Sequence, residues 1–512
     1  MSGMVKLRPG TPNDINRDYL PECIKHSDIV VNENGNNSQP MPKRLLEFAW
    51  LLDENGDLTN DPEKGMSGEW YEYVPENYDP SKKTPLVVSC HGGLMTGWGQ
   101  CIYSSWSLVA DREGFICVFP NGHVGRFWQM QSFPGQKKLA GLDGFPSPAP
   151  SPTIEENVDC QFLLRLIKYM QKKYNIDPGR IYMQGMSNGS GMTQQFSRYY
   201  GNLLAGAACS AGPGRIKGYV DSEKNLINRG GPVAVWESHP ENNGFGNSSM
   251  ETEARAVRES RYYWLTINKC DPIPTISIIG ENNLAFYSGE APYVLDDIKI
   301  RDHGQTLDEA FLYWDYLLAG SYRDENGVIH QDQTPLSRGG DENAAAVTPG
   351  VKTAWWHNQS VELDAAPVRW QKLKYHGLNG DQLVRGEYTC VPVSFLAEIA
   401  GGKLEVSEDT LTAVMLLPDG RRLQFARGSI GCVIDNSLRC MYCEALHREG
   451  TLLVSIEWFA RAILNWTSTE CNDVTYITDH HAELSYFMAD LIKDILRGNP
   501  LPENFVEEAL KD

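Results

Sequence analysis

One short stretch of the sequence places a serine between two glycines at the end of an apolar run. Residues 180–192 read RIYMQGMSNGSGM, in which Gly185, Ser187 and Gly189 form a Gly-x-Ser-x-Gly pattern. The segment before it is typical of a buried strand, and the segment after it is compatible with a helix. Such a tight turn excludes side chains at both glycines and holds the serine in a strained, exposed conformation. Ser187 is therefore a candidate nucleophile, with a serine in an ordinary glycine-rich turn as the alternative.

Strands and helices alternate around this turn. The runs PLVVSCHGG and GFICVFPNG are short, apolar and end in glycine, which is typical of buried parallel strands. Residues 154–173 precede the strand at 180–185 and carry apolar side chains at helical spacing, namely Phe162, Leu163, Leu166, Ile167 and Met170. Alternation of this kind predicts an α/β domain with a parallel sheet.

The chain has 512 residues, which is long enough for at least two domains. Residues 334–350, TPLSRGGDENAAAVTPG, are small, polar and glycine-rich, as linkers are. We therefore expect an α/β domain at 1–333 with its core at 68–325, a linker at 334–350, and a smaller α+β domain at 351–480. A helical tail follows at 481–512. The first domain is expected to fold without the others.

The second domain contains a repeat. Residues 386–406 and 450–469 each combine a strand with an amphipathic helix, and the repeat aligns Val391 with Val454 and Phe395 with Trp458. Both copies resemble the repeat of the copper amine oxidase N-terminal-like domain, which predicts a tandem α+β unit. The name implies no copper site here, because no histidine cluster has ligand spacing. Because the CxxC pair Cys440 and Cys443 has no second pair, only His447 behind it, we predict no metal and no cofactor.

Charge and composition exclude several classes of partner. The chain has 66 acidic and 46 basic residues and a net charge of −20, which disfavours nucleic acid and anionic membranes as partners. No run is long and apolar enough for a membrane span, and the first twenty residues lack the apolar core of a secretory signal. The sequence as written predicts a cytoplasmic protein, or a secreted one if a signal has been removed. Twelve scattered cysteines favour buried free thiols in a reducing compartment.

A second motif supplies candidate donors for an oxyanion. The strand PLVVSC ends in His91, Gly92 and Gly93, where glycine lets backbone amides approach an oxygen that the amide of Asn188 also faces. An ordinary strand-end turn is the alternative. Residues 73–93 and 172–192 together resemble esterases of the polyhydroxybutyrate depolymerase and feruloyl esterase type, carbohydrate esterase family one. The resemblance extends over about 68–325 and implies an α/β-hydrolase doubly wound sheet.

The resemblance also implies the order serine, acid, histidine for a catalytic triad. Glu241, in the segment GGPVAVWESHPENNG, falls where the family carries its acid, with Asp271 and Asp302 as alternatives. His303 lies on a loop between a short strand and a helix, as the family's base does, and a surface histidine is the other interpretation. Trp128 is a candidate to stack on an aryl or sugar group, although core packing explains it equally well.

These features predict a serine hydrolase that cleaves carboxylic esters through an acyl-enzyme. Esters of saccharides, feruloyl esters and polyester oligomers are the expected substrates. Two other readings stay open: a catalytically weak hydrolase scaffold whose second domain binds a polymer, and a serine peptidase on the same fold. The sequence also leaves a homo-oligomer open.

Overall fold

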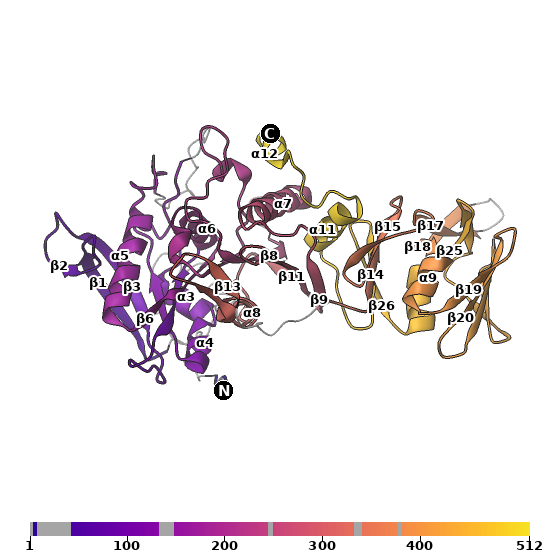
Figure 1. Ribbon diagram of the computed structural model, residues 1–512, viewed down its shortest axis with the longest axis horizontal. Helices are drawn as coiled ribbons and strands as arrows, with labels where there is room; N and C mark the ends of the chain where they lie inside the picture. Colours follow the sequence, from indigo (N-terminus) through magenta and orange to yellow (C-terminus); the bar gives the residue numbers. More distant parts are fainter. Residues whose placement is uncertain are drawn as a thin grey trace.

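The computed structural model describes residues 4–7, 42–132, 148–243, 249–331, 340–376 and 381–511. The molecule is elongated, with a large α/β unit at one end and a β-rich unit at the other (Figure 1). Helix α11 (Tyr486–Leu496), near the end of the chain, lies between the two units. The described helices include none long and apolar enough to cross a membrane.

An eleven-stranded mixed sheet forms the centre of the α/β unit, in the order β2-β1-β3-β5-β4-β6-β7-β8-β11-β10-β9. The six central strands from β5 to β11 are parallel, as the sequence predicts, and the strands at both edges are antiparallel. The strands are β1 (Leu45–Leu52), β2 (Leu58–Thr59), β3 (Met66–Tyr73), β4 (Thr84–Cys90), β5 (Ile116–Pro120), β6 (Ile176–Met186), β7 (Gly206–Ser210), β8 (Ala234–Asn242), β9 (Thr275–Ile279), β10 (Asn282–Tyr287) and β11 (Tyr293–Asp302).

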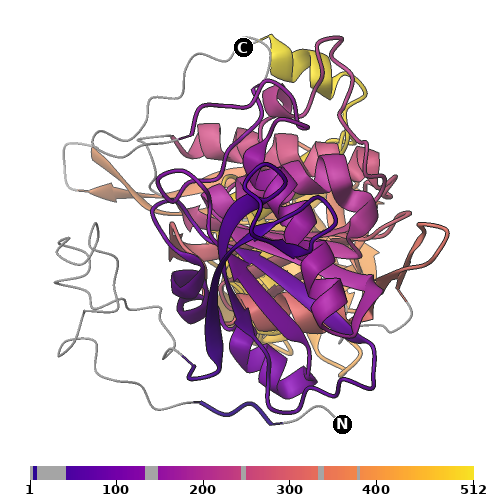
Figure 2. The same ribbon diagram turned by 90° about the vertical axis from the view of Figure 1, so that its left-hand side faces the viewer.

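Helices cover both faces of this sheet (Figure 2). Alternate strand residues enter different cores, because successive side chains of a strand point to opposite faces. Leu86 and Val88 of β4 thus belong to one core, and Val87 belongs to the other. The first core includes α5 (Val158–Lys173), α6 (Asn188–Tyr200) and α7 (Met250–Ile267), and the second includes α3 (Gly97–Tyr103), α4 (Trp106–Glu113) and α8 (Glu309–Tyr316). A hairpin of β12 (Ser321–Arg323) and β13 (Ile329–Gln331) follows.

Three antiparallel sheets form the β-rich unit. The first contains β14 (Ala344–Val347), β15 (Thr353–Trp356), β16 (Gln359–Glu362), β26 (Thr467–Cys471) and β27 (Val474–Thr478); the second contains β17 (Val368–His376), β18 (Asp381–Pro392), β24 (Leu446–Arg448) and β25 (Thr451–Ser455). The third runs from β19 (Lys403–Val406) through β20 (Thr412–Leu416), β21 (Arg422–Ala426) and β22 (Gly431–Ile434) to β23 (Ser437–Cys440).

The two segments of the proposed repeat have similar local structure and lie side by side. Strand β18 leads into α9 (Val393–Ile399), and β25 leads into α10 (Ile456–Phe459). The two strands pair antiparallel, and Val391 lies opposite Val454. The residues aligned in the sequence therefore become neighbours in one sheet.

The segment expected to be a linker contains a strand instead. Residues 344–347 form β14, which pairs with β15 and β27, while 334–339 lie outside the described residues. All four residues of β14 are almost fully buried. Their small side chains, three of them alanine, fit a closely packed interior, and the same smallness gives them the composition of a linker. The boundary drawn from composition is therefore wrong for these four residues.

The C-terminal tail packs against the α/β unit. Arg258 of α7 forms an ion pair with Asp490 of α11 at 2.7 Å, and Arg261 forms one with Asp494 at 2.6 Å. The apolar face of α11 is buried in the same core as α5, α6 and α7, together with residues of β14 and β27. The two units thus share one continuous core at this point. Helix α12 (Phe505–Leu510) ends the chain.

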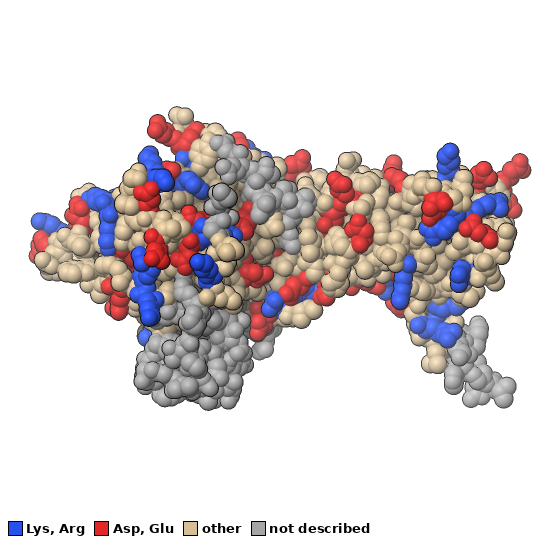
Figure 3. Space-filling model, turned by 90° about the horizontal axis from the view of Figure 1, so that it is seen from below, with Lys and Arg blue, Asp and Glu red and all other residues tan. Residues whose placement is uncertain are grey.

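The described residues contain free cysteines and a mixed distribution of surface charge. Every described cysteine is a free thiol. Cys443 is buried with its Sγ atom 3.6 Å from that of Cys390, whereas Cys440 is exposed, so the CxxC pair does not converge on one point. Acidic and basic side chains are interspersed over the described part of the face in Figure 3.

Candidate active site

Ser187 occupies the sharp turn between β6 and α6, at the carboxyl edge of the parallel strands. Its backbone has φ 54° and ψ −114°, which is strained for a residue with a side chain. The turn is held by hydrogen bonds from the Ser187 amide to the Ser210 carbonyl at 2.8 Å and from the Gly191 amide to the Ser187 carbonyl at 3.1 Å. A strained turn that is fixed in this way exposes the hydroxyl at the sheet edge.

Both flanking glycines are required by close backbone contacts. A Cβ atom at Gly185 would lie 2.0 Å from the Gly189 carbonyl oxygen, and one at Gly189 would lie 2.3 Å from that of Cys90. Real Cβ atoms do not approach so closely, and the neighbours here are backbone. The first pair packs the strand against the helix, and the second packs the helix against the end of β4. The turn therefore has the close packing that its two glycines predict.

His303 lies directly beside this serine. Its Nε2 atom is 2.9 Å from the Ser187 Oγ atom. Burial lowers the pKa of His303 below its usual value, and the charges of Asp302 and Glu253 oppose that effect only in part. The imidazole is therefore neutral at neutral pH. A neutral Nε2 without a proton can accept the hydrogen of the serine hydroxyl.

The other ring nitrogen of His303 contacts Asn243, which no sequence motif marks as a site residue. The Nδ1 atom lies 2.5 Å from the Asn243 Oδ1 atom. An amide oxygen only accepts hydrogen bonds, so Nδ1 carries the proton and Nε2 is free to accept. The Asn243 Nδ2 atom in turn donates to Glu253 at 3.3 Å. The order from the serine is thus hydroxyl, imidazole, amide and carboxylate.

Strand register explains why Asn243 meets His303. Strands β8 and β11 are parallel neighbours, and Asn242 pairs with Asp302 across an irregularity at which Ile300 adopts a φ of 66°. Asn243 and His303 are the next residues on the two strands. They therefore leave the sheet side by side, at the same edge as Ser187.

Glu241, the predicted acid, makes other contacts. Its carboxylate lies 3.3 Å from the Lys299 Nζ atom and accepts the backbone amide of Tyr486, the first residue of α11. It thus binds a cation and a helix N-terminus, both of which favour a negative charge. The structure does not bring Glu241 to His303, so the expectation that Glu241 is the triad acid needs correction.

The two alternative acids lie elsewhere. Asp302 is exposed and precedes His303, where its charge acts on the imidazole without taking the place that Asn243 occupies at Nδ1. Asp271 is exposed in the turn before β9, and its Oδ1 atom accepts the amide of Ile273. Among the described residues, Asn243 is the one that the structure shows at the Nδ1 atom.

The glycine loop after β4 packs against the serine turn. A Cβ atom at Gly92 would lie 2.8 Å from the Met186 sulfur atom, so this loop contacts the end of β6. His91 is fully buried, and burial lowers its pKa to about 4, which keeps the ring neutral. Its Nε2 atom accepts the amide of Gly122 at 3.0 Å. Gly93 follows, partly buried, next to the ring of Phe127.

Trp128 is buried, so its ring does not offer a face for stacking on a substrate. Only 1% of the side chain is exposed, and the ring packs 4.9 Å from that of His91. Its indole nitrogen donates to the His91 carbonyl at 2.8 Å, and its backbone amide donates to the Asn188 Oδ1 atom at 2.6 Å. The core-packing interpretation therefore describes Trp128, which ties the glycine loop to the start of α6.

A buried amide cluster fixes the loop that carries His303. The Gln305 Oε1 atom accepts hydrogen bonds of 3.2 Å from Gln100 of α3 and from Gln184 of β6. Gln184 lies three residues before Ser187, so the cluster joins the base loop to the strand that carries the serine. No sequence pattern marks these three glutamines. They are spread over 205 positions and meet only in the folded chain.

Over about a third of its length the chain is similar in sequence to proteins that are named as esterases, which supports the predicted reaction class, carboxylic ester hydrolysis. The chain is 30% identical over 152 residues to a bifunctional acetylxylan esterase/xylanase from Neocallimastix patriciarum, covering 30% of this chain and 19% of that protein. It is 30% identical over 180 residues to feruloyl esterase B from Neurospora crassa (33% and 54%) and 26% identical over 155 residues to a poly(3-hydroxybutyrate) depolymerase from Ralstonia pickettii (29% and 29%).

The matches concern only part of each protein. The chain spans between 19% and 54% of the length of these three relatives. Among solved structures it is similar to an acetyl xylan esterase from Aspergillus awamori (TM-score 0.38, 16% identity, 53% of this chain and 98% of that chain). A ferulic acid esterase from Anaeromyces mucronatus gives a TM-score of 0.33 at 15% identity, over 52% and 88% of the two chains. No family model matches the chain.

Proposed function

We propose that this protein hydrolyses carboxylic esters, with Ser187 as nucleophile and His303 as general base. The observation that carries the proposal is the 2.9 Å contact between the His303 Nε2 atom and the Ser187 Oγ atom, in a strained turn at the carboxyl edge of the sheet. The esterase names of the relatives support the same reaction class.

The reaction follows from the positions of these groups. Ser187 attacks the ester carbonyl while its proton passes to the Nε2 atom of His303. Backbone amides of Gly93 and Asn188 are proposed to stabilise the oxyanion, with Gly92 shaping the loop. His303 then protonates the leaving alcohol, and the acyl group stays on Ser187. Water attacks the acyl-enzyme in the same way and releases the carboxylic acid, which restores the serine.

Asn243, rather than Glu241, is proposed to hold the imidazole. Its amide oxygen fixes the tautomer in which Nδ1 carries the proton, as a carboxylate would. A neutral amide stabilises the imidazolium less than a carboxylate does, because it lacks a full negative charge. The Glu253 carboxylate accepts a hydrogen bond of 3.3 Å from the Asn243 amide, and its charge thus lies one residue further from the imidazole. The arrangement favours correct orientation of the base over strong charge stabilisation.

The proposed substrates are acetyl or feruloyl esters of saccharides, or hydroxyalkanoate oligomers. The support is the similarity to acetylxylan esterases, feruloyl esterases and a poly(3-hydroxybutyrate) depolymerase. Residues 351–480, with their resemblance to the copper amine oxidase N-terminal-like domain, are proposed as an accessory unit for polymer binding or for assembly into an oligomer. The antiparallel pairing of the two repeat strands supports an internal duplication.

Hydrolysis of p-nitrophenyl acetate by wild type, Ser187→Ala and Ser190→Ala tests the proposal. Ser190 is a matched control, because it lies three residues further on and its hydroxyl donates to the Gly212 carbonyl. We expect activity in wild type and Ser190→Ala and its loss in Ser187→Ala. A wild-type protein inactive on acetyl, feruloyl and hydroxyalkanoate esters would favour a catalytically weak scaffold, and cleavage restricted to peptides would favour a peptidase.

A further inference from the structure

A polar cavity lies beside the C-terminal half of α6, away from Ser187. It has a volume of about 450 Å³, which is within the range of small-molecule sites. Arg198 is eleven residues from Ser187, so about 16 Å of helix separates the two positions at 1.5 Å per residue. The lining is mainly polar and includes Gln131, Gln195, Arg198, Asp221, Asn228 and Arg229. The proposed ester chemistry uses none of these residues.

Arg198 is the unusual residue of this cavity. Its side chain is 7% exposed, yet its Nε and Nη1 atoms have no hydrogen-bond partner. Among the described residues, no carboxylate lies within ion-pair distance of it; its guanidinium contacts the ring of Tyr219 at 4.3 Å. A buried cation without a counterion is costly, because burial removes its hydration. An anionic ligand from outside the chain would therefore stabilise the buried guanidinium.

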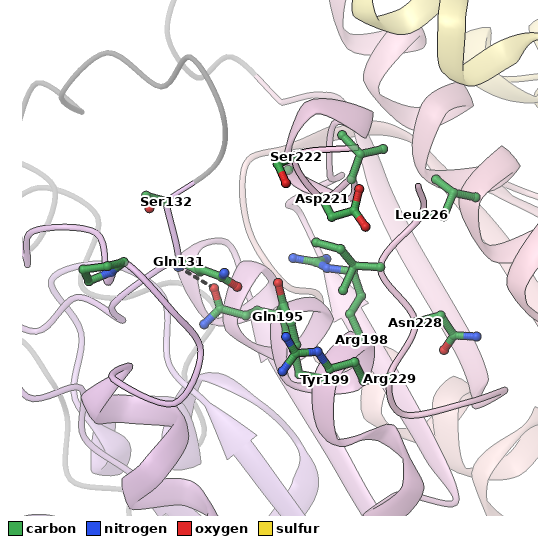
Figure 4. A pocket seen from close by; sticks show the side chains of 14 residues that line it. Gln131, Ser132, Gln195, Arg198, Tyr199, Asp221, Ser222, Leu226, Asn228 and Arg229 are labelled. Carbon is green, nitrogen blue, oxygen red and sulfur yellow. Dashed lines mark hydrogen bonds between the residues drawn. The ribbon is translucent and has the colours of Figure 1, made fainter. Parts of the chain in front are cut away.

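Two buried acceptors in the same lining also lack partners. The side-chain oxygens of Gln131 and Asn228 are buried and accept no hydrogen bond. In Figure 4, Gln131 and Gln195 lie on one side of Arg198, and Asn228 and Leu226 lie on the other. The cavity thus combines unsatisfied donors on a cation with unsatisfied acceptors on two amides.

The remaining charged groups of the lining are already engaged. Arg229 is paired with Glu155 at 2.7 Å, so its charge is compensated. Asp221 is exposed, and its Oδ1 atom accepts the amides of Glu223 and Asn225. Asp221 repels an anion from that side. Arg198 consequently supplies the principal attraction for a negative group.

We propose that this cavity binds a hydroxylated carboxylate of sugar size, a uronic acid or the acidic unit of a saccharide. The carboxylate accepts hydrogen bonds from Arg198, and the hydroxyl groups donate to the side-chain oxygens of Gln131 and Asn228. A phosphate ion offers mostly acceptors and leaves both amide oxygens unsatisfied. A neutral sugar leaves the buried guanidinium without a counterion. The site goes beyond the proposed ester hydrolysis and does not depend on it.

Calorimetric titration of the full chain with sodium D-glucuronate tests the site, with D-glucose and inorganic phosphate as comparison ligands. For glucuronate we expect a Kd on the order of 1 mM or tighter, and binding of the other two at least about tenfold weaker. Ser187→Ala should bind glucuronate as wild type does, because it leaves the cavity intact. That variant separates failure of this site from failure of the proposed ester hydrolysis.

Two variants locate the binding. Arg198→Gln should weaken glucuronate binding about tenfold or more, because the charged contact to the carboxylate is lost. Arg421→Gln removes the same charge at a partly exposed position paired with Asp419, away from the cavity, and it should bind as wild type does. If Arg198→Gln does not fold, Asn228→Asp keeps the size of the side chain and should weaken binding by repulsion.

Three results would overturn the proposal. The first is no heat of binding for glucuronate with wild type. The second is equal binding of phosphate or of glucose, which would indicate a general anion site or a neutral sugar site. The third is unchanged binding in Arg198→Gln or, where that variant does not fold, in Asn228→Asp.

Discussion

Asn243 accepts the Nδ1 proton of His303 over 2.5 Å, so a neutral amide orients the imidazole whose other nitrogen contacts Ser187. The contact arises because Asn242 and Asp302 pair in register at the ends of parallel strands. The next residue of each strand is then brought to the same edge. This relationship distinguishes the roles of Asn243 and Glu241, which lie two positions apart.

Ser187→Ala should lower the turnover of p-nitrophenyl acetate by about a thousandfold or more, because loss of a nucleophile typically removes several orders of magnitude in rate. The melting temperature should stay close to that of wild type, since one partly exposed hydroxyl leaves no cavity. Steady-state kinetics and differential scanning calorimetry measure the two effects. Activity above a few per cent of wild type would move the nucleophile to another residue.

Asn243→Ala should lower kcat by roughly tenfold to a thousandfold while KM changes little, because the imidazole loses its orientation but the substrate contacts remain. Glu241→Gln should leave kcat near the wild-type value. It should cost about 1 kcal/mol of unfolding free energy, because it weakens the contacts to Lys299 and to the N-terminus of α11. Kinetics and urea unfolding of both variants provide the comparison.

The reverse pattern, a slow Glu241→Gln and a fast Asn243→Ala, would restore Glu241 as the triad acid. Glu253→Gln serves as a further control. It removes the charge behind Asn243 and keeps a hydrogen-bond acceptor for the Asn243 amide. A modest fall in kcat, smaller than that of Asn243→Ala, is the expected outcome.

The sequence predicts Ser187 and His303 because each depends on local pattern and chain order. The glycines around Ser187 are required by contacts within the turn itself. A Cβ atom at Gly185 would lie only 2.0 Å from the Gly189 carbonyl oxygen. The identity of the residue that orients His303 depends on where β8 ends and on the register of β8 with β11. That register shifts at the irregularity where Ile300 has a positive φ. No local pattern encodes such a shift, so Glu241 and Asn243 are not distinguishable by counting.

The pH dependence of kcat/KM should show an acid limb below pH 6.5. Activity needs neutral His303, and burial lowers the pKa of this group, so the imidazole loses its proton at a lower pH than an exposed one. Asn243→Asp places a negative charge at Nδ1, which favours the imidazolium, and should move the limb to higher pH. An acid limb well above pH 6.5 in wild type would contradict the neutral environment described for His303.

Glu309 should make the protein less stable as pH rises. Burial raises the pKa of this carboxyl from 4.5 to about 8 in the folded chain. Between these values the folded state holds a proton that the unfolded chain has released, so the free energy of unfolding falls with rising pH, by on the order of 1–4 kcal/mol. Glu309→Gln should flatten this dependence.

Urea unfolding of Glu309→Gln and wild type at about pH 5 and about pH 9 measures the effect. Glu503→Gln is the control, because Glu503 is exposed. Parallel changes with pH in wild type and Glu309→Gln would show that other groups dominate the dependence.

A chain ending at residue 333 should be poorly soluble or unstable, contrary to what composition predicts. The truncation removes β14, β27 and α11, whose apolar residues share one core with α5, α6 and α7. It also removes the backbone amides of Tyr486 and Phe487, which donate to side-chain oxygens of Glu241 and Asp297.

Asp297 lies at the contact that the truncation removes. It is fully buried, and burial raises its pKa well above the usual value even with α11 in place. Without that helix, the hydrogen bond from the Phe487 amide is lost, and the apolar residues of β14, β27 and α11 no longer cover the core of the α/β unit. A chain ending at residue 500 is the control: it lacks α12 but keeps α11, and we expect it to be soluble and active. Circular dichroism melting and ester hydrolysis of both truncated chains test this prediction. A 1–333 chain with the melting temperature and turnover of the full protein would show that the α/β unit folds alone.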